Sequence, residues 1–263
     1  MRRILSLSFL IIIVVSCKNF ETESGVEADP DTTPAEQFPE NLSKVFDAHG
    51  GLDRWKRMKN LCFFIEVPGV DETHTVSLPK RLTKIETSAW AIGYDGEAVW
   101  LLNHEDYGYQ GNARFYHNLM FYFYAMPFVL ADEGIVYTPL GIHELLGEKY
   151  NAFKISYEDG IGDSSRDEYI LYSDPETHRM EWVGYTVTYR NNIKSGDWHF
   201  VKYDEWKPVN GLLLPKTISW YTVEGNKPKV KRNSITFLNR SITETELEPS
   251  VFKKPDSAEV VPR

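Results

Sequence analysis

Cysteine is scarce in this sequence, which has only Cys17 and Cys62 among its 263 residues. Two thiols exclude the multiple disulfides of a small stapled domain and a zinc site built from paired cysteines. Cys62 lies in the apolar run LCFFIEV. We therefore expect its side chain to be buried and unreactive, because apolar surroundings disfavour the thiolate.

Positive charge is also in short supply. The 29 lysines and arginines are outnumbered by 38 aspartates and glutamates, which gives a formal net charge of −9. A protein that binds nucleic acid needs basic side chains to neutralise phosphates. The composition therefore predicts that nucleic acid is not a partner.

Hydrophobic runs long enough to span a membrane are missing too. In residues 115–130, 13 of 16 residues are apolar or aromatic, but the run contains Pro127 and is followed by Asp132 and Glu133. A spanning helix needs about 20 predominantly apolar residues. This run therefore predicts part of a folded core rather than a membrane helix.

Motifs for catalysis and nucleotide binding are absent as well. Gly160 and Gly162 lack the third glycine of a nucleotide loop, and His143-Glu144 lacks the second histidine of a zinc-protease helix. The His-Glu-Asp cluster at residues 104–106 consists of adjacent side chains, which cannot all converge on one metal ion. The sequence therefore predicts no catalytic residue, no metal and no cofactor, and we expect a protein that is not an enzyme. A hydrolase of unknown type is kept as an alternative, ranked below the two binding functions described later in this section.

What is present begins with a secretion signal. Arg2 and Arg3 precede an apolar segment of 12 residues, 4–15, which is followed by Ser16 and Cys17. The tetrad Val-Val-Ser-Cys at residues 14–17 resembles the bacterial lipobox, in which the cysteine becomes the first residue of the mature protein. We expect residues 1–17 to form a lipoprotein signal peptide and Cys17 to carry the acyl chains, such as palmitate, that hold the protein on a membrane.

Residues 18–39 are acidic and contain several prolines, which predicts a disordered tether. As a flexible coil, these 22 residues would reach roughly 25 Å from the membrane. The expected location is the bacterial cell envelope, as an outer-membrane lipoprotein that faces the periplasm or the cell surface.

Residues 40–263 are of the right length for one domain. Short helices are predicted at residues 41–49 and 52–58. Because the strands that follow are joined by short turns, they can only be antiparallel neighbours. The expected architecture is a curved antiparallel sheet with helices against its inner face. The predicted strands are residues 61–67, 73–78, 81–87, 97–103, 151–158, 166–173, 179–189, 197–206, 212–224 and 230–242.

Residues 114–134 interrupt the strands with an apolar segment that favours helix. A helix with apolar side chains on nearly all sides must be covered on most sides, and Pro127 favours two short helices that meet at Met126. The segment could be a plug on the sheet, a helix that lines an apolar ligand cavity, or a pair of strands. If a cavity is present, we expect Tyr116, Met120 and Phe123 to face the ligand and the opposite face to contact the sheet. The candidate ligand-binding residues are Trp100, Phe115, Tyr116, Leu119, Met120, Phe123, Met126, Tyr185 and Trp220.

Aromatic residues are abundant, with 7 Trp, 15 Tyr and 14 Phe. Most are expected to fill the core, but stacking on sugar rings is an alternative use. Alternation places Val183 and Tyr185 on the inner face of their strand and Trp182 on the outer face. A single exposed tryptophan would not make a glycan-binding platform. A surface lipoprotein that binds glycans or has a structural interaction role is therefore kept only as the second candidate function.

A resemblance to a known family is carried by the order of four motifs. These are AHGGLDRWKRMKNL at residues 48–61, YDGEAVWLL at 94–102, YILYSDPETHRMEWV at 169–183 and YDEWKPVNGLLLPKTI at 203–218. Together they resemble the LolA/LolB-type lipoprotein-carrier superfamily over about residues 40–255. The resemblance implies a fold that is mainly β with some α-helix. In this fold a strongly curved, antiparallel, half-open β-barrel is closed by short helices, and its cavity holds acyl chains. We therefore expect a membrane-anchored, monomeric, non-enzymatic lipoprotein that binds a lipid, an acyl chain or an acylated partner.

Overall fold

The computed structural model describes residues 38–104, 108–158, 166–189 and 193–262. These residues belong to one compact unit that begins at Phe38, close to the boundary expected at residue 40. The signal segment, Cys17 and residues 18–37 of the predicted tether lie outside the described residues.

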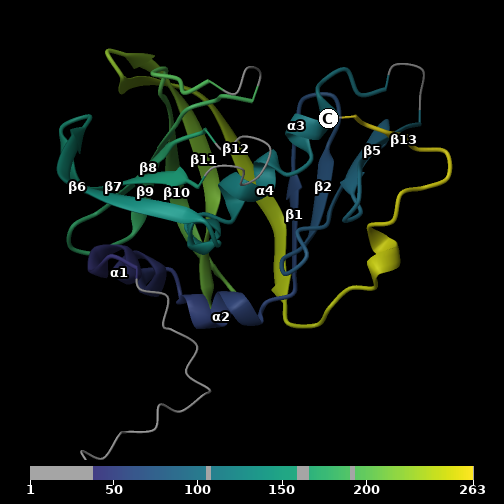
Figure 1. Ribbon diagram of the computed structural model, residues 1–263, viewed down its shortest axis with the longest axis horizontal. Coiled ribbons are helices and arrows are strands. Elements are labelled where there is room, and N and C mark those ends of the chain that lie inside the picture. Colours follow the sequence, from purple (N-terminus) through teal and green to yellow (C-terminus); the bar gives the residue numbers. More distant parts are fainter. Residues whose placement is uncertain (1–37, 105–107, 159–165, 190–192, 263) are drawn as a thin grey trace, which may run out of the picture. The chain divides into compact units, whose positions relative to one another are not determined.

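Most of the described chain forms one antiparallel sheet (Figure 1). Across the described residues its strands lie in the order β13-β5-β4-β3-β2-β1-β12-β11-β10-β9-β8-β7-β6, so β13 and β6 are the edges and the sheet does not close. The expected half-open, curved antiparallel barrel is confirmed. The strands are β1 (Asn60–Ile65), β2 (Glu72–Ser77), β3 (Thr83–Glu86), β4 (Trp90–Tyr94), β5 (Val99–Asn103), β6 (Ile135–Leu145), β7 (Glu148–Tyr157), β8 (Tyr169–Ser173), β9 (Met180–Tyr185), β10 (His199–Val209), β11 (Leu212–Glu224), β12 (Lys227–Thr243) and β13 (Glu259–Val260).

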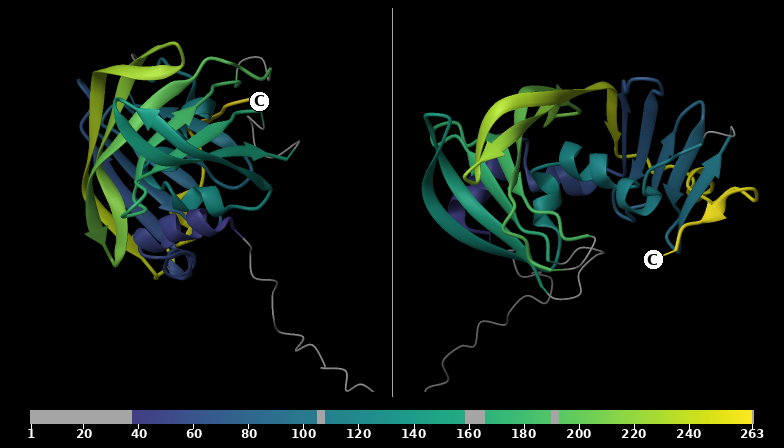
Figure 2. Two further views of the ribbon diagram at one scale, coloured as in Figure 1. Left: turned by 90° about the vertical axis from the view of Figure 1, so that its left-hand side faces the viewer. Right: turned by 90° about the horizontal axis from the view of Figure 1, so that it is seen from above.

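The chain order explains why residues 113–131 are so apolar. Strands β1 to β5 run outward to one side of the sheet, and β6 starts again at the opposite edge. The chain must therefore cross the sheet between β5 and β6, and it does so inside the curve of the sheet (Figure 2). The crossing consists of α3 (Ala113–Tyr116), α4 (Leu119–Tyr124) and the 3₁₀ helix η1 (Phe128–Ala131).

The helix expected over residues 114–126 is divided. It is interrupted at His117 and Asn118, and Asn118 precedes α4 with a backbone conformation of φ −127° and ψ −1°. The carboxamide oxygen of Asn112 accepts a hydrogen bond from the Phe115 amide and caps α3. The strand alternative for this segment is wrong.

The N-terminal helices complete the inner layer, as expected. Helices α1 (Glu40–Ala48) and α2 (Leu52–Arg57) bury Phe46 and Trp55 in the main core. The Trp55 ring stacks on Phe128 of η1 at a centroid distance of 4.8 Å and an interplanar angle of 9°. The same core holds inner-face residues of strands that lie far apart in the sheet, such as Ile155 of β7 and Phe237 of β12.

The sequence did not reveal β4, β6 or the short β13. Strand β6 contains Pro139, and the pairing of β6 with β7 shifts by one residue between Pro139 and Gly141. Proline cannot donate to a strand ladder and is confined to edge strands and bulges, which is the position that β6 occupies. Most of its side chains are exposed, so it shows no clear apolar alternation.

The outer face of the sheet corrects two expectations. Trp182 does point away from Val183 and Tyr185, but it is only 1% exposed, because it packs in a second cluster with Tyr172 and Phe200. Cys62 is only partly buried. Alternation along β1 sends Leu61 and its neighbours at odd positions into the core and sends Cys62 outward, so its expected burial is wrong.

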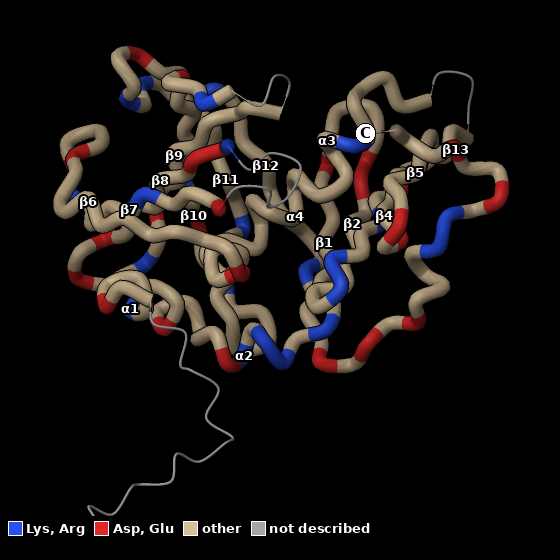
Figure 3. The backbone as a smooth tube through the Cα atoms, in the orientation of Figure 1, with Lys and Arg blue, Asp and Glu red and all other residues tan. Residues whose placement is uncertain are grey.

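Charged residues of both signs are interleaved along the described backbone (Figure 3). None of the described helices is long and apolar enough to cross a membrane.

Candidate functional site

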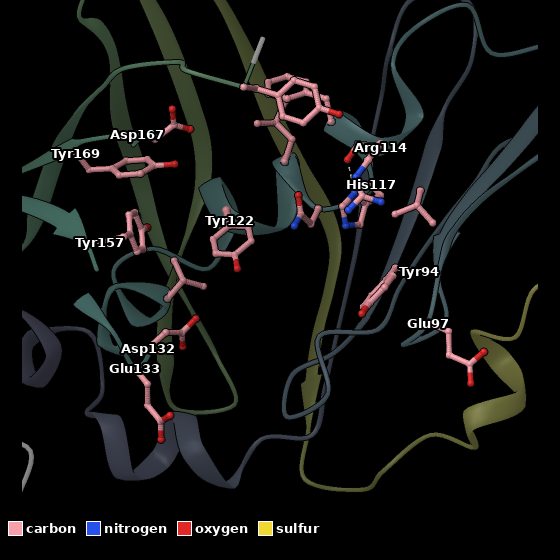
Figure 4. Close-up of a pocket in the computed structure, with 16 residues that line it drawn as sticks. Tyr94, Glu97, Arg114, His117, Tyr122, Asp132, Glu133, Tyr157, Asp167 and Tyr169 are labelled. Atoms are coloured by element: carbon pink, nitrogen blue, oxygen red, sulfur yellow. Dashed lines mark hydrogen bonds between the residues drawn. The ribbon is translucent and has the colours of Figure 1, made fainter. Parts of the chain in front are cut away.

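A cavity of about 360 Å³ lies on the inner side of the sheet, beside α3 and α4 (Figure 4). Tyr157 and Tyr169 form one side, Tyr94 and Glu97 form the other, and Tyr122 of α4 lies between them. The helical crossing therefore divides its apolar surface between the core and this cavity. The lining residues are Tyr94, Glu97, Val99, Arg114, Phe115, His117, Asn118, Leu119, Tyr122, Val129, Asp132, Glu133, Tyr157, Asp167, Tyr169 and Tyr189.

Three tyrosines, Tyr122, Tyr157 and Tyr169, form what we call the phenol cluster. Tyr169 opens β8 and pairs with Ile155 of β7, which places Tyr157 on the same inner face. The rings of Tyr157 and Tyr169 stand nearly perpendicular, with centroids 6.1 Å apart and an interplanar angle of 82°. Two walls of the cluster are thus set by the register of β7 and β8, and the third comes from α4.

The hydroxyls of the phenol cluster face the cavity without a protein partner. Among the described residues, none forms a hydrogen bond with the hydroxyl of Tyr122, Tyr157 or Tyr169. Buried polar groups in folded proteins are normally paired with protein or water. These hydroxyls are therefore available to a ligand, as donors and as acceptors.

Burial raises the pKa of each phenol, so all three stay protonated at neutral pH. Negative charge adds to this effect, because Asp132 and Asp167 further raise the pKa of Tyr157. At Tyr122, in contrast, the positive charge of Arg81 acts to lower the pKa and opposes the effect of Asp132.

Asp167 is fixed beside the cluster by Thr188. The Thr188 amide and hydroxyl both donate to Oδ1 of Asp167, at 2.6 and 2.7 Å. Burial raises the pKa of this carboxyl group, whereas the two hydrogen bonds act to lower it. Because both bonds fall on Oδ1, Oδ2 is the oxygen left for a ligand.

Asp132 lies on the same side of the cavity and is paired within the protein. Its Oδ1 accepts from the Arg81 guanidinium, which also lies over the ring of Phe121 at 5.3 Å from the centroid. This contact ties the loop before β3 to the end of η1.

The opposite side is formed by the β4–β5 turn and α3. The Tyr94 hydroxyl donates to the Gly96 carbonyl at 2.9 Å, and the Tyr94 ring lies 5.9 Å from the ring of His117. Glu97 also lines this side of the cavity. In total, the lining contains the carboxylates of Glu97, Asp132, Glu133 and Asp167 and one guanidinium, that of Arg114.

An apolar strip runs along the helical crossing between these polar groups. Phe115 packs against Tyr189 with ring centroids 5.1 Å apart, and Leu119 and Val129 continue the strip. The cavity can therefore take a molecule that has both an apolar part and a polar part.

Two of the predicted ligand-binding residues, Phe115 and Leu119, line the cavity. The face expected to contact the sheet is the one that lines the cavity, and the face expected to contact a ligand is buried. Met120 and Phe123 are 3% and 5% exposed and belong to the main core, as does Met126.

The remaining candidates lie in three other places. The Phe123 ring contacts Tyr185 and Trp220 in the core, and Trp220 donates to the Tyr185 hydroxyl at 3.1 Å. Trp100 is fully buried in a separate small cluster, where its indole donates to the Phe252 carbonyl at 3.2 Å. The Tyr116 hydroxyl donates to buried Glu72.

Sequence reasoning missed the phenol cluster and Asp167. A signal for Tyr169 was strand alternation, which places Tyr169 and fully buried Leu171 on one face of β8, and Asp167 lies two residues before Tyr169. Asp167 and Tyr169 precede the buried Leu171, so they lie at the edge of the core, where a cavity can begin.

Metal ligands do not gather in this part of the molecule. Within the described ranges, no three His, Cys, Asp or Glu side chains come close enough together to hold a metal ion. Two residues of the His-Glu-Asp cluster at 104–106 lie outside those ranges.

A family profile described as a family of unknown function (DUF6503) matches residues 79–235, which is more than half of the chain. The chain belongs to this family. The part matched to DUF6503 runs from just before β3 into β12 and so includes the helical crossing and the cavity. No curated protein matches the sequence.

Solved structures with a similar fold include two bacterial proteins. A LolA superfamily protein from Nitrosomonas europaea is 11% identical, with a TM-score of 0.43, and the match covers 74% of this chain and 88% of that one. A DUF1329 family protein from Desulfovibrio piger is 9% identical, with a TM-score of 0.43, and covers 82% of this chain and 98% of that one. The first of these structures is described as a member of the superfamily that the four sequence motifs resemble. At these identities and TM-scores the likeness says nothing about ligand or partner, so function is inferred from the cavity.

Proposed function

We propose that this DUF6503 protein is a lipid-anchored, non-enzymatic lipoprotein of the bacterial cell envelope that binds an amphipathic molecule in the cavity. The observation that carries the proposal is the composition of the lining. Phe115, Leu119 and Val129 offer apolar surface, and the phenol cluster offers unpaired hydroxyls at one end of the same space. A plug that only completed a core would leave no such cavity.

The expected energetics are adequate for a small amphiphile. Each buried CH₂ group contributes about 0.8 kcal/mol, and association costs about 4 to 15 kcal/mol. A chain of six to ten carbons would thus offset about 5 to 8 kcal/mol of that cost. Hydrogen bonds to the phenol cluster would supply the remainder and the specificity.

Ligand binding is tested on the mature, lipidated protein isolated from the envelope. Native mass spectrometry and extraction should find a small amphipathic molecule bound to the wild type. Leu119→Trp fills the apolar strip and should lose it, whereas Val230→Ala, at a position 66% exposed on β12, should retain it. Equal ligand content in the wild type and in Leu119→Trp would overturn the binding function.

The anchor is tested separately. The lipobox-like tetrad at residues 14–17 supports acylation of Cys17. Cys17→Ser should release the protein from membranes, as seen by envelope fractionation and detergent partitioning. Membrane retention unchanged by Cys17→Ser would exclude a lipid anchor at this residue.

A further inference from the structure

We propose that the phenol cluster and Asp167 form a subsite for a positively charged ammonium group, so that the amphiphile held in the cavity is cationic at its polar end. The inference rests on the proposed function, because it assigns the chemistry of the ligand's head group. It is carried by three aromatic rings, one carboxylate and the charge balance of the lining.

The rings have the arrangement that an ammonium group requires. Tyr157 and Tyr169 meet nearly at a right angle, at 82°, and Tyr122 approaches from α4 on a third side. A cation within about 6 Å of an aromatic face is attracted by the quadrupole of the ring, and several rings around one point form a cage for quaternary ammonium groups. The three rings and Asp167 all line the same cavity (Figure 4).

The carboxylate of Asp167 is held in place by the protein itself. Thr188 fixes Oδ1 with two hydrogen bonds, so the orientation of the carboxylate does not depend on a ligand. No lysine or arginine among the described residues makes an ion pair with Asp167. An ammonium group would supply the missing positive charge, and in a partly buried site that attraction is stronger than in water.

The charge balance of the whole lining points the same way. The lining contains four carboxylates and one guanidinium. Of these four carboxylates, Asp132 forms an ion pair with Arg81. A fatty acid, a sulfate or a phosphate head group placed beside Asp167 would be repelled. An uncharged sugar could bond to the tyrosine hydroxyls, but it would leave Asp167 without a positively charged partner.

The test compares short amphiphiles that share one chain and differ in the head group. The mature, lipidated protein in phosphatidylcholine nanodiscs is titrated calorimetrically with hexyltrimethylammonium, hexyl glucoside and hexyl sulfate, and titrations of empty nanodiscs are subtracted. We expect hexyltrimethylammonium to bind about tenfold more tightly than hexyl glucoside and more tightly still than hexyl sulfate, as one cation–π cage with a carboxylate would give.

Two pairs of variants locate the effect. Asp167→Asn can still accept from Thr188 but loses the charge, and it should weaken hexyltrimethylammonium binding about tenfold and change hexyl glucoside binding little. Asp71→Asn removes the same charge at an exposed position outside the cavity and should change neither. Tyr157→Phe keeps the ring and should bind the cation within about threefold of wild type, whereas Tyr157→Leu should lose about tenfold.

The outcomes separate the two proposals. Equal binding of all three probes, or preference for hexyl glucoside or hexyl sulfate, overturns the ammonium site and leaves the amphiphile-binding function in place. Equal weakening by Asp167→Asn and Asp71→Asn also overturns the site, because it would show a long-range charge effect. Failure of all three probes to bind overturns both proposals.

Discussion

The hydroxyl of Tyr116 donates a hydrogen bond of 2.7 Å to Oε2 of Glu72, the same oxygen that lies 2.8 Å from Nε2 of His74. Glu72 and His74 are only 4% and 2% exposed, and the ring of Phe63 stacks on His74 at 4.6 Å. Burial lowers the pKa of His74, more than its contact with Glu72 raises it. A polar network in the core thus attaches α3 to β2 and fixes one end of the helical crossing.

The first prediction concerns this attachment. Tyr116→Phe removes a hydrogen bond to a buried carboxylate and should lower the free energy of unfolding by about 1 to 3 kcal/mol, measured by urea denaturation. Tyr94→Phe is the control, because the Tyr94 hydroxyl bonds to the Gly96 carbonyl at an exposed site and should cost less than about 0.5 kcal/mol. If the two variants were equally stable, the Tyr116–Glu72 bond would not hold α3 in place.

The second prediction concerns pH. Burial is the main cause that lowers the pKa of His49 from 6.5 to about 4, and Arg179 adds to the shift. Its Nδ1 bonds to the Val45 carbonyl at 2.7 Å, and its buried Nε2 has no partner among the described residues. In acid the unfolded chain therefore binds a proton before the folded protein does.

The contribution of neutral His49 to stability is therefore complete above pH 6.5 and is lost as the pH falls toward about 4. The loss can reach about 1.4 kcal/mol per pH unit inside this window. We expect the unfolding free energy of His49→Leu to depend less on pH than that of the wild type between pH 6.5 and 5. Parallel pH profiles of the two proteins would contradict this.

Strand alternation and turn composition were enough to predict the regular part of the sheet. Strands β7 to β12 present an apolar face to one core, and their antiparallel register follows from tight turns. The edge strand β6 could not be predicted, because an exposed edge places no demand on alternation and tolerates Pro139.

The site was harder to predict for a geometric reason. Phe115 and Leu119 were found because they belong to one conspicuous apolar segment. The phenol cluster comes from α4, β7 and β8, and it forms only because the chain crosses the sheet at one particular place. Helical spacing identifies the two faces of the helical crossing, but it does not show which face lines the cavity. For that reason the prediction that Met120 and Phe123 face a ligand is wrong.

A third prediction follows from the outward position of Cys62. Its thiol lies 3.9 Å from the Thr75 hydroxyl and is partly accessible. We expect a maleimide to label Cys62 in the native protein, more slowly than it labels a Val230→Cys variant, with peptide mapping to separate Cys62 from Cys17. Labelling of Cys62 only after addition of denaturant would contradict the partly exposed position.

The last prediction distinguishes the two faces of α4. Phe123 is buried against Tyr185 and Trp220, and its carbonyl accepts from the Tyr203 hydroxyl at 2.9 Å. Leu119, four residues earlier, lines the cavity. Phe123→Ala should therefore lower the unfolding free energy by about 3 to 5 kcal/mol, the usual cost of truncating a core aromatic side chain.

Leu119→Ala should cost much less stability, because its side chain already borders open space and its removal enlarges a cavity rather than creating one. It should instead weaken the binding of hexyltrimethylammonium and hexyl glucoside alike, since it removes contact with the chain that the probes share. Urea denaturation and calorimetry on the same protein preparations measure both effects. A Leu119→Ala variant that lost as much stability as Phe123→Ala, with unchanged binding, would mean that both faces of α4 belong to the core and that the crossing is only a plug.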